Sequence, residues 1–126
     1  MRGHLAALDV DIGDAINVVI AVLQEPPATE IERAKVIGDL YAILSRTELS
    51  LREASKISGP LLGDGAKEAE AWDRSIREIL GEALYETHLP AFTSIIGKLL
   101  APLKELHQVV KKMEDIRYAN SKMRRD

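Results

Sequence analysis

The chain lacks cysteine, is poor in aromatic residues and has no long apolar run, and each absence excludes a class of protein. Without cysteine, disulfide scaffolds, thiolate chemistry and sulfur-based metal sites are excluded. Aromatic residues make up 4% of the 126 residues, so the core must be mainly aliphatic. No stretch reaches the roughly 18–20 apolar residues of a membrane span, and Asp9, Asp11 and Asp14 interrupt any signal-peptide core. We therefore expect a helical protein of the cytoplasm.

The net charge of −3 is distributed unevenly along the chain. Residues 1–94 carry 9 basic and 16 acidic side chains, whereas residues 95–126 carry 8 basic and 4 acidic ones. A basic end on an acidic protein indicates contact with phospholipid, nucleic acid or an acidic protein. The alternative interpretation is an ordinary solvated helix face.

Apolar residues in the last third of the chain follow one another at alternating spacings of four and three. This period keeps one side of a helix facing a partner helix over a long distance. We call the following nine residues the heptad seam: Tyr85, Leu89, Phe92, Ile96, Leu99, Leu103, Leu106, Val110 and Met113. Arg117 and Asn120 continue the spacing with polar side chains. Because the seam exceeds what the first two helices can comfortably cover, we expect a homo-oligomer, with a dimer favoured, or a partner protein's helix to complete it. Pairing within the chain is the open alternative.

Apolar periodicity predicts helices in a single domain that spans residues 1–126. Their approximate bounds are 5–24, 29–58, 66–88 and 91–123. No pair of strand patterns competes with this interpretation. The predicted fold class is all-α, with three to four helices in a helical bundle or extended coiled coil and a long, kinked C-terminal helix.

Proline, glycine and capping residues mark the helix ends in the first half of the chain. Pro26-Pro27 ends the first helix, because proline cannot continue the hydrogen-bond ladder. Thr29 and Glu32 then form a capping-box pattern at the start of the second helix. Gly59-Pro60 ends that helix, and we expect residues 61–65 to form a loop.

Two prolines interrupt the last third without breaking the phase of the heptad seam. Pro90 and Pro102 each remove a backbone donor, so each implies a kink or a short break in one long helix. Alternatively, His88-Leu89-Pro90 is a boundary, and Pro90 lies in the first turn of a new helix.

No residue pattern indicates catalysis or metal binding. The three histidines, His4, His88 and His107, are dispersed, and none has a second histidine or a carboxylate at the spacing of a helical metal pair. We therefore expect neither an enzyme nor a bound cofactor or metal.

Basic residues along the final helix are the candidates for binding an anionic surface. They are Lys104, Lys111, Lys112, Arg117, Lys122, Arg124 and Arg125. Each Lys or Arg near an anionic membrane contributes roughly 1 kcal/mol. The same face could bind nucleic-acid phosphates, but Tyr118 is the lone aromatic candidate for base stacking. We therefore rank a membrane or an acidic protein above nucleic acid.

Leu100-Ala101-Pro102-Leu103-Lys104-Glu105-Leu106, followed by Val109 to Tyr118, resembles the second long helix of a BAR domain. The segment from Leu51 to Lys56 is similar to the first helix of that family. The resemblance implies a kinked coiled-coil homodimer that senses or generates membrane curvature, with Lys111, Lys112, Arg117, Lys122, Arg124 and Arg125 facing lipid. A BAR protomer has three long helices, whereas this chain ends where the third would begin, so either the sequence is a fragment of a larger protein or the resemblance reflects only generic coiled-coil character.

Together these patterns predict a non-enzymatic helical interaction or scaffold module. Its sharpest version is a membrane-associated, coiled-coil dimer of BAR type, peripheral to the membrane. The first alternative is a compact bundle that docks a partner protein's helix, with residues 16–23 or the heptad seam as the groove. The second alternative is nucleic-acid binding through the basic C-terminal helix.

Overall fold

The computed structural model describes residues 3–57 and 60–123, and of residues 4, 57, 60–63 and 118–123 the backbone alone. It contains five helices and, within these residues, no strand. They are α1 (His4–Gln24), α2 (Glu30–Ile57), α3 (Pro60–Tyr85), α4 (Leu89–Gly97) and α5 (Leu100–Met123). The all-α prediction is confirmed.

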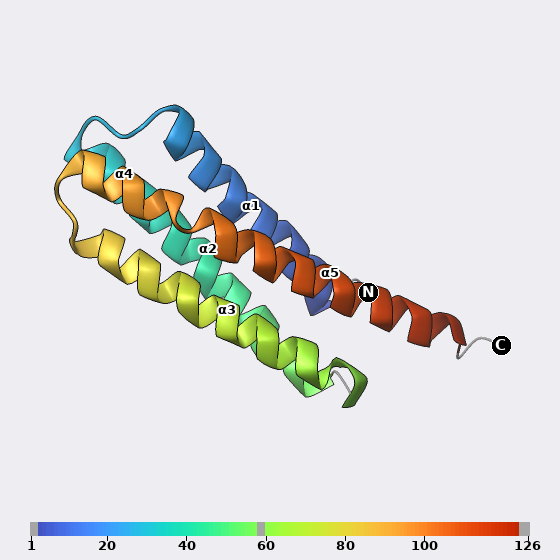
Figure 1. Cartoon of the computed structure of the whole chain (residues 1–126). Helices are drawn as coiled ribbons and strands as arrows, with labels where there is room; N and C mark the ends of the chain where they lie inside the picture. Colours follow the sequence, from blue (N-terminus) through green and yellow to red (C-terminus); the bar gives the residue numbers. More distant parts are fainter. Residues whose placement is uncertain (1–2, 58–59, 124–126) are drawn as a thin grey trace.

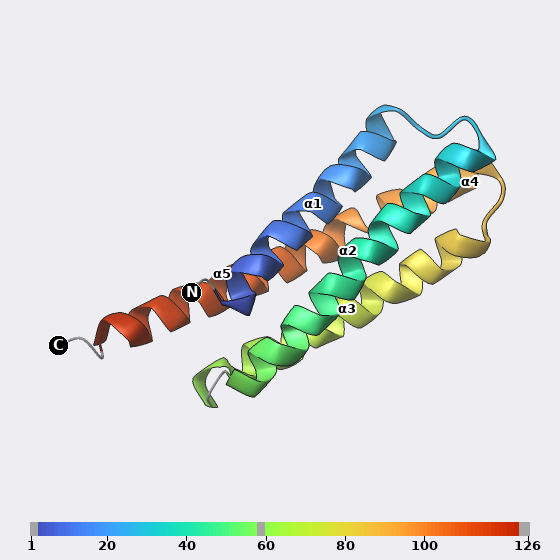
Figure 2. The same ribbon diagram turned by 180° about the vertical axis from the view of Figure 1, so that it is seen from behind.

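The helices form a four-membered antiparallel bundle in which α4 and α5 together make the fourth member (Figure 1). α1 packs against α2 and α5, and α3 packs against the same two, so α1 and α3 lie diagonally opposite. Successive members of the bundle run in opposite directions, as short connections require, and the last turns of α5 extend past the start of α1 (Figure 2). The α1–α2 and α3–α4 links lie together at one end of the bundle, which we call the loop end.

The start of α2 follows the predicted capping chemistry. The Glu32 amide donates to Thr29 Oγ1 over 3.1 Å, and Glu32 Oε2 accepts from the Ala28 amide over 2.7 Å. Two otherwise unpaired donors at the helix start are satisfied in this way. The carboxylate reaches one residue further back than the usual capping box.

Both prolines of the last third lie in first helical turns. Pro90 is in the first turn of α4 behind His88 as N-cap, and Pro102 is the third residue of α5. Amides in a first turn have no intrahelical acceptor, so proline costs nothing there. α4 and α5 are joined at Lys98 and Leu99, whose amides donate to carbonyls three residues earlier. The long, kinked C-terminal helix is confirmed. The alternative boundary at His88-Leu89-Pro90 is also confirmed, because α3 ends at Tyr85 and α4 begins at Leu89.

The loop predicted over residues 61–65 is wrong, because α3 already begins at Pro60. Proline is compatible with a first helical position, and no described glycine has the positive φ that a glycine turn uses. Gly65 instead allows close packing, since a Cβ there would lie 2.8 Å from Cγ of Met113 on α5.

The heptad seam is buried inside the single chain. Seven seam residues, from Phe92 to Met113, are at most 1% exposed and form one core with α1, α2 and α3. The seam therefore needs no second chain to cover it, because α3 supplies the cover that α1 and α2 lack, and a homo-oligomer stays a prediction. Tyr85 leaves the seam at the end of α3 and is 83% exposed, Leu89 is half-buried and Arg117 is exposed. Asn120's side chain lies outside the described part.

Candidate functional site

The predicted anionic-surface residues are dispersed on the outside of α5. Lys104, Lys111 and Lys112 are exposed, and the first two share a face because they are seven residues apart. Arg117 is also exposed and lies beside Gly3, at the start of α1. The side chain of Lys122 and residues 124–125 lie outside the described part, so binding of an anionic surface stays a prediction.

His107 links α5 to α1. Its Nε2 lies 2.6 Å from Asp9 Oδ1, and both side chains are partly exposed. Burial raises the pKa of the nearby Glu114, and the negative charges of Asp9 and Asp115 raise it further. No three His, Asp or Glu side chains within the described ranges are placed to hold a metal ion. The pair joins two helices, and its members are too far apart in sequence for spacing rules to have found it.

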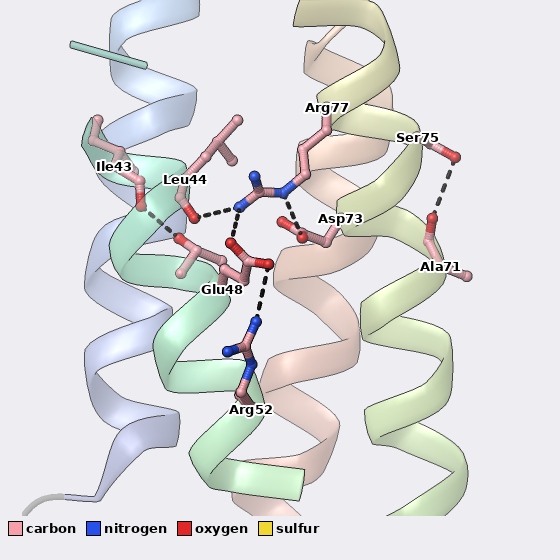
Figure 3. Close-up of polar contacts among 9 residues, drawn as sticks. Ile43, Leu44, Glu48, Arg52, Ala71, Asp73, Ser75 and Arg77 are labelled. Carbon is pink, nitrogen blue, oxygen red and sulfur yellow. Dashed lines mark hydrogen bonds and ion pairs between the residues drawn. The ribbon is translucent and has the colours of Figure 1, made fainter. Parts of the chain in front are cut away.

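A polar cluster occupies the interface between α2 and α3. We define the α2–α3 polar cluster as Glu48 and Arg52 from α2 with Asp73 and Arg77 from α3 (Figure 3). Arg77 Nε donates to Asp73 Oδ2 over 2.9 Å, and its Nη2 donates to the Leu44 carbonyl over 2.9 Å. The same Nη2 lies 3.3 Å from Glu48 Oε2, and Arg52 Nη2 donates to Glu48 Oε1 over 3.3 Å. One guanidinium thus joins two helices and two carboxylates.

Asp73 is the most unusual member of this cluster. Its side chain is only 10% exposed, and the buried Oδ1 has no hydrogen-bond partner among the described residues. Burial raises the pKa of Asp73, an effect that Arg77 partly opposes. Sequence reasoning missed this residue, although its position on the buried face of α3, three residues before Ile76 and four before Arg77, was a usable signal.

A groove of about 220 Å³ opens beside the cluster, between α2 and α3. Its lining residues are Glu48, Leu51, Arg52, Glu70, Asp73 and Arg74. Ser55 Oγ lies 3.3 Å from Glu70 Oε1 at this groove. The exposed Arg74 forms no ion pair with the residues that the structure describes. The groove lining therefore combines three carboxylates, Glu48, Glu70 and Asp73, with two guanidinium groups, Arg52 and Arg74.

The loop end of the bundle is held together by Arg33. Its guanidinium makes two 2.8 Å hydrogen bonds to Glu30 and donates to the Ala83 and Leu84 carbonyls at the end of α3. It also lies 5.5 Å from the ring centre of Phe92 on α4. Arg33 therefore joins α2, α3 and α4 beneath the surface.

Apolar side chains and hollows gather at the same end. Five of the eight large apolar residues that the described part leaves exposed lie there: Ile20, Leu23, Ile31, Leu84 and Tyr85. A groove of about 510 Å³ runs between α1 and α2, and Val18, Ala21, Val22 and Val36 form its apolar lining. Glu25, Glu32, Asp39 and Lys35 contribute its charged lining. Across Pro26 and Pro27, a second hollow of about 380 Å³ is bounded by Leu89, Pro90 and Thr93.

Comparisons with known proteins identify no relative of this chain. No protein-family model matches the chain, and no curated protein or solved structure matches it significantly. Within the described ranges, none of the helices combines the length and apolar character needed to cross a bilayer. The functional argument therefore depends on the surfaces themselves.

Proposed function

We propose that the chain is a non-enzymatic interaction module, a compact helical bundle that docks a basic amphipathic helix of a partner protein in the groove between α1 and α2. The observation that carries this proposal is the concentration of exposed apolar side chains and of two hollows at the loop end. Contiguous exposed apolar surface is typical of interaction sites. A helix laid in a groove buries such surface through residues at i, i+3, i+4 and i+7.

Charge complementarity selects the occupant. The groove lining contains Glu25, Glu32 and Asp39 against the single base Lys35. An apolar stripe flanked by Lys or Arg matches both the apolar floor and the acidic rim, whereas an acidic helix would be repelled. Val18, Ala21 and Val22 come from the segment 16–23, one of the two grooves that the sequence suggested. The other, the heptad seam, is filled by the chain's own helices.

The membrane and nucleic-acid alternatives have less support. The BAR-type reading uses the seam for dimerisation, and seven seam residues already pack inside one chain. The exposed lysines of α5 supply charge without a hollow or an aromatic surface beside them. Both alternatives stay predictions, and the binding experiment described below distinguishes them from the docking proposal.

A synthetic amphipathic helix of leucine and lysine, labelled for fluorescence anisotropy, tests the docking proposal. Its scrambled form, with the same composition and charge, controls for electrostatic attraction alone. We expect saturable binding of the amphipathic peptide and much weaker binding of the scrambled one. Light scattering on the free protein should show a compact monomer, because the seam is satisfied internally.

Two variants test whether the peptide binds in the groove between α1 and α2. Ala21→Asp puts a charge on the groove floor, and Asp39→Lys reverses a rim charge. Each variant should bind the amphipathic peptide about fivefold or more weakly than the wild type does, since one interfacial charge contributes on the order of 1 kcal/mol to the binding free energy. Ala42→Asp and Glu78→Lys, at exposed positions outside the groove, are the matched controls.

Equal binding of the two peptides, or equal loss in the control variants, would overturn the docking proposal. Phosphatidylserine vesicles and a DNA duplex complete the test. Salt-sensitive binding to vesicles without peptide binding would support the membrane alternative, and salt-sensitive binding to the duplex would support the nucleic-acid alternative.

A further inference from the structure

We propose that the helix that docks in the groove between α1 and α2 belongs to a second copy of this chain, whose last turns of α5 extend beyond their own bundle. We call residues 116–123 the α5 overhang. The contact is head to tail, because the overhang of one copy meets the groove of the next. This inference rests on the proposed function, since it names the occupant of the same groove.

The α5 overhang leaves the cover of its own bundle. Arg117 lies beside Gly3, just before α1 begins, and α5 continues to Met123. Both views show these last turns running past the start of α1 and the start of α3, with no helix of the described ranges alongside (Figures 1 and 2). A short helix is marginal in water unless an apolar face packs against something, so a docking surface would stabilise these turns.

The residues of the overhang follow an amphipathic pattern. Ile116 is 39% exposed, and positions 119 and 123, at i+3 and i+7 from it, carry alanine and methionine. These spacings place the three residues on one face of the helix. From residue 116 to residue 126 the sequence has four basic side chains and one acidic one. The segment is therefore a short, basic, amphipathic helix.

The groove between α1 and α2 has the opposite charge. Its lining contains Glu25, Glu32 and Asp39 against the single base Lys35. Asp14, which is exposed four residues before the first groove residue of α1, extends the acidic rim. A net negative groove and a net positive helix attract one another and disfavour the pairing of two grooves or of two overhangs.

The two surfaces also match in length. On α1 the groove runs from Val18 to Glu25, and the overhang runs from Ile116 to Met123. Both segments are eight residues long and span about 10 Å at 1.5 Å per residue. The apolar lining at Val18, Ala21 and Val22 can therefore meet the apolar face of the overhang along its whole length.

The overhang cannot reach the groove of its own chain. The groove lies at the loop end, whereas the overhang projects from the opposite end of the bundle (Figure 1). Leu106, Val110 and Met113 are at most 1% exposed and hold α5 in the core, so the helix cannot turn back without unfolding. The occupant must come from a second molecule. A contact between two unlike surfaces leaves one groove and one overhang free, so it can repeat.

Sedimentation equilibrium of the full chain, from micromolar to millimolar concentration at low salt, tests the head-to-tail contact. Because only about two turns of helix dock, we expect dilute protein to be a monomer and larger species to form as the concentration rises. The average mass should rise from the 13.9 kDa of one chain to beyond that of a dimer. Added salt should lower it by screening the attraction. The amphipathic leucine–lysine peptide should lower it by competing for the groove, whereas its scrambled form should not.

Variants of either surface should weaken the association. Ile116→Asp places a charge on the apolar face of the overhang, Lys122→Glu reverses one of its charges, and Ala21→Asp alters the groove. Each should raise the dissociation constant about fivefold or more, and circular dichroism checks that each is folded. Lys67→Glu, at an exposed lysine of α3, is the matched control for Lys122→Glu and should change nothing.

Mixing the two kinds of variant distinguishes a contact between unlike surfaces from one surface that pairs with itself. The Ala21→Asp chain keeps an intact overhang, and the Lys122→Glu chain keeps an intact groove. An equimolar mixture should therefore form dimers, and growth should stop there because each pair has only one intact contact. Asp39→Lys, at an exposed position, replaces Ala21→Asp in the mixture if that variant does not fold.

Three results would overturn the proposal: a full chain that stays monomeric at millimolar concentration, association that the groove and overhang variants leave unchanged, and a mixture that forms no dimer. If the chain stays monomeric while the leucine–lysine peptide still binds the groove, the occupant is a helix of another protein, and the proposed function stands without this inference. If a labelled peptide of residues 111–126 binds phosphatidylserine vesicles but not the protein, the overhang binds membranes and the proposal is overturned as well. If neither peptide binds the protein, this inference and the proposed function both fail.

Discussion

The two interfaces that α3 makes differ in chemistry. Towards α5, α3 meets seam residues such as Leu106 and Met113, which are large, apolar and inaccessible to water. Towards α2, it contributes Asp73 and Arg77, and Arg77 pairs with both Asp73 and Glu48. Apolar burial stabilises a bundle, whereas a buried ion pair offsets most of its attraction with lost hydration. The comparison indicates that the α5 side contributes more to the stability of the fold than the α2 side does.

The largest effect is expected on the α5 side. Leu106→Ala should lower the free energy of unfolding by about 2–5 kcal/mol, because it leaves a cavity at a side chain that is 0% exposed. Leu49→Ala makes the same change at a leucine that is 62% exposed and should cost less than about 1 kcal/mol. Urea denaturation followed by circular dichroism measures both, and similar losses would contradict the internal seam.

Charged substitutions sharpen this result. Leu99→Asp combined with Leu106→Asp should unfold the chain, since both side chains are buried within it. If the doubly substituted chain keeps its helicity and only its mass falls in light scattering, the seam joins subunits and the internal packing described above is wrong.

A smaller effect is expected where α3 meets α2. Arg77→Met removes the partner of Asp73 and the donor to the Leu44 carbonyl, so we expect a loss of about 1–3 kcal/mol in the free energy of unfolding. Arg74→Met, three residues earlier and exposed, is the control and should stay within about 0.5 kcal/mol of the wild type. If the two arginine variants lose the same stability, the cluster does not join the helices as described.

Two glycines of α3, Gly65 and Gly81, differ in how closely the rest of the protein packs against them. A Cβ at Gly81 meets no atom within 4 Å, so Gly81→Ala should stabilise the protein by about 0.5–1 kcal/mol through helix propensity. At Gly65 the same gain is opposed by contact with Met113, and Gly65→Ala should be less stable than Gly81→Ala by about 1–2 kcal/mol. Thermal unfolding measures the difference, and equal melting temperatures would place Gly65 away from α5.

The smallest effect is a pH dependence at Asp73. Burial raises its pKa above the ordinary value of 3.8, so the folded chain binds the proton more tightly than the unfolded chain. The cost of the charged carboxylate is fully present above the raised pKa and is relieved as the pH falls through it towards 3.8. The stability of the wild type relative to Asp73→Asn should therefore rise on acidification. Urea denaturation across that range checks the sign, and a fall would contradict burial as the dominant cause.

Sequence patterns predicted most helix positions. They failed where contacts between residues far apart in the sequence determine the structure. The capping residues Thr29 and Glu32 and the starter prolines Pro90 and Pro102 act within one helical turn, so they can be read locally. The helical start at Pro60 was missed because the contact of Gly65 with Met113, 48 residues later, is absent from any local window. The α2–α3 groove was missed for the same reason, since Glu48 and Arg77 meet only after folding.

The sequence by itself determined the all-α class and the residues of the seam from Phe92 to Met113, because helix period, caps and prolines act over short distances. Only the tertiary structure decided that α1 and α3 cover that seam from within the chain. The same apolar stripe would satisfy any partner helix equally well, since hydrophobic burial is not directional. Connection lengths, close approach at Gly65 and the hydrogen bonds that Arg33 and Arg77 donate to carbonyls of neighbouring helices select the internal partners.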